Sequence, residues 1–149
     1  MKKISLILFL ACLFTGFSSK AQFAKYSQAD ATELVKSIYL QVLEREGEPL
    51  GVGGWANYLV NGTKTVQDLV YEIGISYEYS GKFVDRETPA EAIRLMHVHF
   101  LGREPESVAA SDRWVATLKS VGHRETIKKM VYSSEYNHNF GKTAVPYHL

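Results

Sequence analysis

The chain has 149 residues, with 17 basic side chains, 16 acidic side chains and a single cysteine. It contains no Lys/Arg block and no basic–aromatic interleaving, which argues against a nucleic-acid partner because phosphate backbones are bound by concentrated positive charge. Its length is that of one ordinary domain with a single hydrophobic core.

The first 21 residues have the order of a signal peptide. Lys2 and Lys3 give a positive start, residues 4–17 are almost wholly apolar, and the small residues Ser19 and Ala21 fit a cleavage site after Ala21. The apolar run is shorter than the roughly 20 residues that a spanning helix needs. We therefore expect removal of this segment and export to the periplasm or outside the cell, with no membrane segment left. The alternative is a retained anchor or a buried first helix.

Removal would change the bulk properties of the chain. Three lysines would leave, so that 17 basic residues become 14 against 16 acidic ones and the formal charge moves from +1 to −2. Cys12 would leave too, and the mature protein would have no disulfide, thiol nucleophile or thiolate ligand. We expect packing alone to hold it together.

Residues 30–147, after a short segment at 22–29, show apolar periodicity typical of helices, and we predict an all-α domain. The apolar-face positions of four predicted helices are Leu34, Val35, Ile38, Val42 and Leu43; Val66, Leu69, Val70 and Ile73; Ala92, Ile93, Met96 and Phe100; and Ser111, Trp114, Val115 and Leu118. Two capping boxes are predicted, one from Thr65 to Asp68 and one from Thr88 to Glu91, and Pro89 suits a first helical position.

The domain is predicted to contain two copies of one helical unit, over about 30–84 and 88–141. Residues 38–46 match 96–104, and residues 76–83 match 133–140. The recurring positions are Arg45/Arg103, Pro49/Pro105, Trp55/Trp114, Gly62/Gly122, Glu78/Glu135, Tyr79/Tyr136 and Phe83/Phe140. Each unit should have a long helix, a turn, a Trp helix, a Gly turn and a short helix before Ser-x-Glu-Tyr. We expect the units to pack face to face around one core, since neither alone buries much apolar area.

The recurring aromatic and charged residues receive structural roles. The predicted core anchors are Trp55, Trp114, Tyr79, Tyr136, Phe83 and Phe140. We predict that Arg45 and Arg103 each form a bidentate pair with the Ser-x-Glu-Tyr glutamate of a unit, Glu78 or Glu135, because a guanidinium matches a carboxylate in this geometry. The alternative is an exposed surface pair of little energetic weight.

No catalytic constellation, cofactor motif or metal motif is found, and we predict that the protein is not an enzyme. His97 and His99 are two residues apart on a predicted helix, so they point about 200° apart and do not form a metal pair. Residues 51–54 are glycine-rich but follow no strand, and a turn is the better interpretation. One acidic turn contains Glu44, Glu46 and Glu48, and the equivalent turn of the second unit contains Glu104 and Glu106. We interpret them as solvated, and binding of calcium or a sugar is the alternative.

Longer motifs in the second half include Leu101, Gly102, Arg103, Pro105, Glu135, Tyr136, Phe140, Gly141, Pro146 and Tyr147. They resemble the phycobilisome linker domain, which carries Leu-Gly-Arg-x-Pro and ends in a Ser-x-Glu-Tyr…Phe-Gly…Val-Pro-Tyr run. Residues 39–83 are similar to the matching first half. They resemble still more closely a related repeat of unknown function from bacterial surface and secreted proteins.

The resemblance implies an all-helical domain that sits inside or between ring-shaped phycobiliprotein discs and binds no bilin covalently itself. The resemblance and the absence of a catalytic constellation predict a non-catalytic protein-interaction or scaffolding module whose protein partner is unknown. The predicted signal peptide adds that this module is exported. One alternative is a genuine phycobilisome linker with phycobiliprotein partners. The other is an envelope protein that binds glycans or calcium.

Overall fold

The computed structural model describes residues 25–147, and within this range the chain is helical and has no strand. The elements are α1 (Gln28–Leu43), α2 (Pro49–Val60), α3 (Val66–Gly74), α4 (Tyr77–Phe83), α5 (Pro89–Met96), the π-helical turn η1 (His97–Leu101), α6 (Val108–Val131) and α7 (Ser134–Asn139). The predicted all-α class is confirmed. None of these helices is long and apolar enough to cross a membrane. The predicted signal peptide lies outside the described residues.

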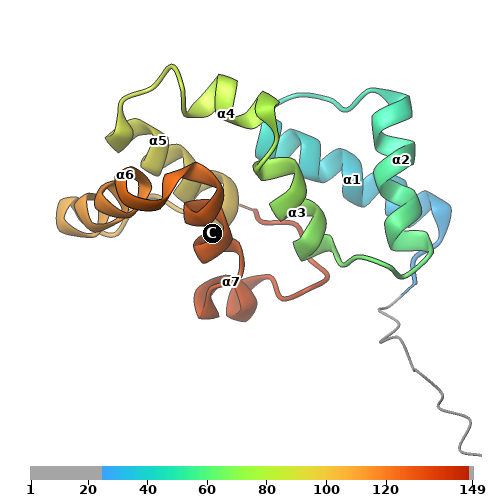
Figure 1. Cartoon of the computed structure of the whole chain (residues 1–149). Helices are drawn as coiled ribbons and strands as arrows, with labels where there is room; N and C mark the ends of the chain where they lie inside the picture. The colour runs from blue at the N-terminus through green and yellow to red at the C-terminus, as the bar shows by residue number, and fades with distance from the viewer. Residues whose placement is uncertain (1–24, 148–149) are drawn as a thin grey trace, which may run out of the picture.

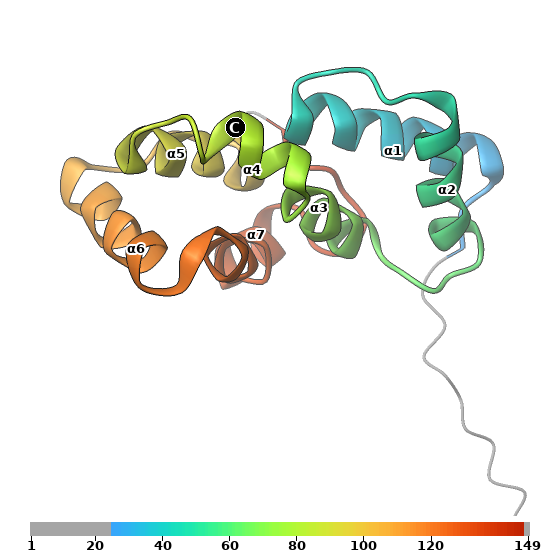
Figure 2. The ribbon, with the colours of Figure 1, turned by 45° about the horizontal axis from the view of Figure 1, so that its top comes forward.

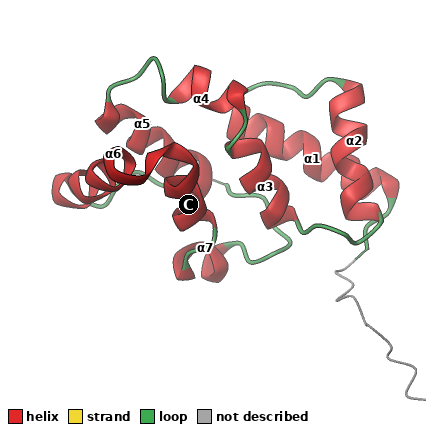
Figure 3. Cartoon of the chain, viewed as in Figure 1, coloured by secondary structure: helices red, strands yellow, loops and turns green. Residues whose placement is uncertain are grey.

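The helices form two groups that share one body. Helices α1, α2 and α3 lie at one end, α5, α6 and α7 at the other, and α4 lies between them (Figures 1 and 2). Short green loops join the red helices in Figure 3. The C-terminal segment runs back from α7 toward the first group, where the Val66 N–H donates to the Lys142 carbonyl at 3.0 Å. The end of the chain therefore ties the second group to the first.

Hydroxyl side chains set the starts of most helices. The N-cap oxygens that accept a first-turn N–H belong to Ser27, Thr65, Ser76, Thr88, Ser107 and Ser133. The predicted capping box between Thr65 and Asp68 is confirmed. The one at Thr88 is only half formed: Thr88 accepts from the Glu91 N–H, but the Glu91 carboxylate binds Arg94 instead of turning back. A bidentate guanidinium out-competes one backbone N–H for the carboxylate.

One core joins both groups of helices. It includes Val35, Ile38 and Val42 from α1, the α3 residues Leu69 and Val70, and apolar side chains of α4, α5, η1, α7 and the end of α6. The predicted apolar faces of α3 and of residues 92–100 are buried throughout. The predicted packing around a single core is thus observed.

Three expectations need correction. The first half of α6 is only partly buried, including Trp114, Val115 and Leu118, because this end lies at the edge of the molecule. Trp55 is also partly buried, so the two tryptophans border the core and do not anchor it. Residues 51–54, expected to form a turn, lie inside helix α2, because Pro49 starts that helix and its packing outweighs the low helix propensity of glycine.

Candidate functional site

The first arginine–glutamate pair fastens the end of α1 to the start of α4. The Arg45 Nε donates to one Glu78 oxygen, and Nη2 donates to the other at 2.7 Å. Nη1 donates to the Glu46 carbonyl and to Glu48, both at 2.7 Å. The Arg45 guanidinium lowers the pKa of the Glu78 carboxyl. The bidentate pair predicted from the sequence is present, and its arginine also holds the turn that follows α1.

The second pair repeats this arrangement between η1 and α7. The Arg103 Nε donates to Glu135 at 2.5 Å, and Nη2 donates to the other carboxylate oxygen at 2.9 Å. Nη1 donates to the Glu104 carbonyl at 3.0 Å, as Arg45 does to its own following residue. Arg103 also lowers the pKa of Glu135. The Arg103 side chain is 24% exposed against 35% for Arg45, so solvent screens the second pair less.

The residue before each arginine caps its helix in the left-handed conformation. Glu44 has φ = 50° and Gly102 has φ = 68°. At Gly102 an added Cβ would overlap the carbonyl oxygen of Tyr147, so only glycine lets the C-terminal segment lie this close. Glu44 instead projects a side chain toward the second group of helices.

The Glu44 carboxylate contacts His99, which is buried among aromatic side chains, and no sequence pattern indicated this contact. The His99 Nε2 lies 3.1 Å from a Glu44 oxygen, and Nδ1 lies 3.1 Å from the Tyr79 hydroxyl. The His99 ring also packs edge-to-face on Phe83, with 4.7 Å between centroids. Burial lowers the pKa of His99, and the bond to Glu44 partly opposes this. These contacts join α1, α4 and η1 through one neutral imidazole.

His97 faces the other way, as its spacing from His99 predicts. Its Nδ1 lies 2.8 Å from the Ile93 carbonyl, and its ring meets Trp114 edge-to-face. Burial lowers the pKa of His97 as well. The two histidines lie on the π-helical turn η1, where the α-helix was predicted to continue. A π-turn widens the helix locally, and periodicity alone does not distinguish it.

The C-terminal motif residues close over the end of η1. Leu101 and Pro146 are buried, and the exposed Tyr147 packs its ring on Phe140 at 5.5 Å. Gly141 follows α7 with φ = 60°, which turns the chain back toward α3. The Val-Pro-Tyr run therefore acts as a strap over the helix end that Gly102 caps.

The predicted aromatic core anchors of the two units differ in one respect. Tyr79, Tyr136, Phe83 and Phe140 are all buried, as expected. The Tyr79 hydroxyl bonds His99, whereas the Tyr136 hydroxyl has no hydrogen-bond partner among the described residues. An unpaired buried hydroxyl costs stability.

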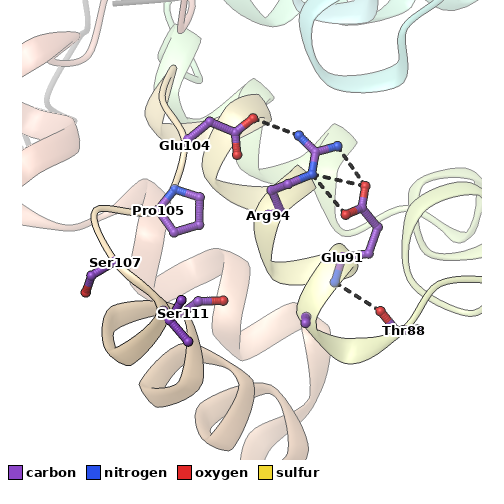
Figure 4. Close-up of a pocket in the computed structure, with 9 residues that line it drawn as sticks. Thr88, Glu91, Arg94, Glu104, Pro105, Ser107 and Ser111 are labelled. Carbon is purple, nitrogen blue, oxygen red and sulfur yellow. Dashed lines mark hydrogen bonds and ion pairs between the residues drawn. The ribbon is translucent and has the colours of Figure 1, made fainter.

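The acidic turns do not converge on a common point. In the second turn Glu104 binds Arg94 at 2.8 Å while Glu106 lies 3.4 Å from Arg103. Figure 4 shows Arg94 held between Glu91 and Glu104 beside Pro105, in an open pocket of about 420 Å³ between the starts of α5 and α6. Among residues 25–147 no group of three or more His, Cys, Asp or Glu side chains is placed to hold a metal ion.

The residues of both turns thus perform structural tasks, and their sequence pattern has a match among known proteins. The profile of the family described as phycobilisome linker polypeptide matches residues 26–149. The chain belongs to the phycobilisome linker polypeptide family. The members of this family are non-catalytic structural proteins, and the prediction that the chain is not an enzyme agrees with this.

Individual relatives show how much of a longer protein the chain matches. It is 36% identical over 125 residues to the phycobiliprotein ApcE of Aglaothamnion neglectum, covering 81% of this chain and 14% of the relative. ApcE of Nostoc sp. is 34% identical over 118 residues, covering 76% of this chain and 10% of the relative. A phycocyanin-associated rod linker polypeptide of Picosynechococcus sp. is 30% identical over 128 residues, covering 83% of this chain and 43% of the relative. The chain spans less than half the length of each of these relatives.

Proposed function

We propose that this linker domain binds a phycobiliprotein and fixes its position without performing chemistry. The observation that carries the proposal is the family match, which extends from residue 26 to 149 and so includes both arginine–glutamate pairs and the Val-Pro-Tyr strap. The relatives named above include a phycocyanin-associated rod linker. The light-harvesting role, held as an alternative on sequence grounds, is therefore the better-supported one.

The geometry suits a domain that must hold partners in a fixed arrangement. Arg45 and Arg103 fasten the ends of α1 and η1 to the short helices α4 and α7, and His99 bridges the two helix groups. A body stiffened in this way loses little conformational entropy on binding, so more of the interaction energy appears as affinity.

Sedimentation velocity with purified phycocyanin or allophycocyanin tests this proposal. We expect the chain to co-sediment with one of them, and the Picosynechococcus rod linker serves as the positive control. Serum albumin replaces the phycobiliprotein in the negative control. Binding by the rod linker but not by this chain, at matched concentration and salt, would show that the family's partner has been lost.

We propose separately that residues 1–21 direct export. The support is the order of positive start, apolar run and small residues at 19 and 21. Expression of the full chain in a bacterium, followed by fractionation and intact mass measurement, tests it. The expected product is exported and begins at Gln22, and a Leu8→Arg variant, which interrupts the apolar run, should retain Met1 inside the cell. A wild-type product that keeps Met1 would end the proposal.

We infer further that residues 30–84 and 88–141 descend from one duplicated unit. The similar spacing of the paired motifs, 58 residues from Arg45 to Arg103 and 57 from Glu78 to Glu135, and the like roles of the two arginines support this. An experimental structure offers the test: the best superposition of the two units should place Arg45 on Arg103 and Glu78 on Glu135. A best fit in any other register would count against duplication.

A further inference from the structure

Helix α2 carries an apolar face that no part of the described chain covers. Leu50 is 90% exposed and Tyr58 43% exposed, while the opposite face, with Val52, Ala56 and Leu59, is buried. No charged residue occurs between Pro49 and Val60. A surface helix ordinarily has a polar outer face, so this one departs from the usual pattern. Helix α2 lies at the outer edge of the molecule in both Figures 1 and 2.

The glycines of α2 fall into two kinds. A Cβ at Gly51 would lie 2.8 Å from the Tyr39 hydroxyl, so packing inside the chain explains that glycine. A Cβ at Gly53 or Gly54 would meet nothing within 4 Å. Glycine in a helix lowers its stability relative to alanine, and here no contact within the described chain requires it. Gly54 lies on the exposed face between Leu50 and Tyr58, one helical turn from each.

We propose that α2 of one chain packs antiparallel on α2 of a second copy, with the two helices crossing at Gly54. A two-fold interface must be self-complementary, because each patch meets its own copy. The face has this property: a large side chain stands four residues on either side of the glycine. In an antiparallel crossing Leu50 of each copy faces Tyr58 of the other. A surface hollow of about 320 Å³, lined by Leu50, Gly54, Trp55 and Tyr58, provides space for the Leu50 side chain of the second copy.

Charge supports the same arrangement. A two-fold contact brings charges near the axis against their own copies, and the charge-free α2 avoids that repulsion. The charged residues at the two ends of the helix are already paired within the chain, Glu48 with Arg45 and Lys64 with Glu72, so neither end presents an unpaired charge to the second copy. Antiparallel packing also aligns the helix dipoles favourably.

Sedimentation equilibrium of the protein alone, from low micromolar to near-millimolar concentration, tests the proposal. The wild type should rise from monomer mass toward twice that mass. Leu50→Glu should stay monomeric over the whole range, because it buries a carboxylate against Tyr58 of the second copy. Leu40→Glu is the matched control, since Leu40 is 55% exposed on α1, and it should dimerise like the wild type. A wild-type protein that is monomeric throughout would overturn the proposal.

The two open glycines give a sharper test. Gly53→Ala and Gly54→Ala should both raise the melting temperature of the monomer by a few degrees, because each improves helix propensity in open space. Only Gly54→Ala should weaken dimerisation, by about tenfold or more, since its Cβ separates the crossing backbones, whereas Gly53 lies 100° around the helix. Equal dimerisation of both variants, each shown folded by its melting curve, would place any dimer contact elsewhere.

A phycobiliprotein is the rival occupant of this face. If the chain stays monomeric, and Leu50→Glu abolishes phycobiliprotein binding while Leu40→Glu retains it, then α2 is the partner surface and the dimer proposal is wrong. If wild type and Leu50→Glu bind phycobiliprotein equally while only the wild type dimerises, the dimer proposal stands. Because self-association is measured without phycobiliprotein, its outcome does not depend on the proposed linker function.

Discussion

The turns after α1 and after η1 have the same backbone plan and different contacts. Each has a left-handed cap, at Glu44 or Gly102, followed by an arginine that grips a glutamate on a short helix. In the first turn the cap side chain reaches His99. In the second turn the missing side chain makes room for the Tyr147 carbonyl. One backbone position therefore supports a polar bridge in one place and a close backbone approach in the other.

Because their contacts differ, the two turns should respond differently to the same kind of substitution. The second turn requires glycine at position 102, because any Cβ would overlap the Tyr147 carbonyl oxygen. The first depends on a partly exposed carboxylate, whose loss solvent can partly compensate. The arginines repeat the contrast in milder form, since Arg103 is the less exposed of the two.

The largest expected effect is that of Gly102→Ala. We expect a loss of about 2–4 kcal/mol in the free energy of unfolding, from left-handed backbone strain together with overlap with Tyr147. Glu44→Ala is the matched control, because its backbone is already left-handed and it loses only the bond to His99, about 1 kcal/mol. Urea unfolding monitored by circular dichroism measures both. Equal losses of unfolding free energy in the two variants would mean that the Val-Pro-Tyr strap does not contact Gly102 closely.

The next effect comes from the arginines. Arg103→Ala should cost about 1–3 kcal/mol, because it leaves a half-buried Glu135 without its charged partner. Arg45→Ala should cost less than about 1 kcal/mol, as solvent screens the more exposed Glu78. Double-mutant cycles with Glu135→Gln and Glu78→Gln isolate the two coupling energies. A larger coupling in the first pair than in the second would reverse the ranking drawn from exposure.

Features that depend on local spacing or on a repeated motif could be predicted from the sequence. Paired positions of Arg45 and Arg103 led to the bidentate glutamate pairs, helical periodicity led to the buried faces of α3 and α5, and Thr65 with Asp68 led to the capping box. Each of these depends on local spacing, or on a motif that appears twice. The helical class followed from the same signals.

Other features depend on contacts between helices that are distant in the sequence, and no local sequence pattern indicates those contacts. The bridge from Glu44 through His99 to Tyr79 joins residues 20 and 55 positions apart in the chain. The π-turn at η1 has ordinary helical periodicity in its apolar residues. Trp114 was assigned to the core from its spacing, yet α6 begins at the edge of the molecule, where amphipathic spacing does not secure full burial.

The pH dependence of stability probes the bridge in the first turn. Burial lowers the pKa of both His97 and His99, so the unfolded chain binds protons more readily than the folded one below about pH 6.5, the usual histidine pKa. Stability should therefore fall as pH drops from 7 to 5, by at most about 1.4 kcal/mol per pH unit for each histidine. Glu44, Lys82 and Arg94 are the charged groups that act on His99.

His99→Gln isolates the contribution of that histidine. The amide keeps hydrogen-bonding capacity toward Glu44 and Tyr79 but does not titrate, so the variant should show a shallower fall in melting temperature between pH 7 and pH 5. His138→Gln, at an exposed position on α7, should leave the slope as in the wild type. An unchanged slope in His99→Gln would assign the pH response to His97 or to other groups. Below this range protonation of Glu78 and Glu135, whose pKa values are lowered, should remove both arginine pairs.

The smallest effect separates the two buried tyrosines. Tyr79→Phe removes a hydroxyl that bonds His99 and leaves the buried imidazole nitrogen without that partner, which should cost about 1 kcal/mol. Tyr136→Phe removes a hydroxyl that has no partner in the described structure, so stability should stay the same or rise slightly. The two substitutions delete the same atom from equally buried rings, and hydrophobic burial cancels in the comparison. Urea midpoints that fall equally in both variants would show that the Tyr136 hydroxyl is hydrogen-bonded in solution, and the contrast between the two aromatic anchors would then disappear.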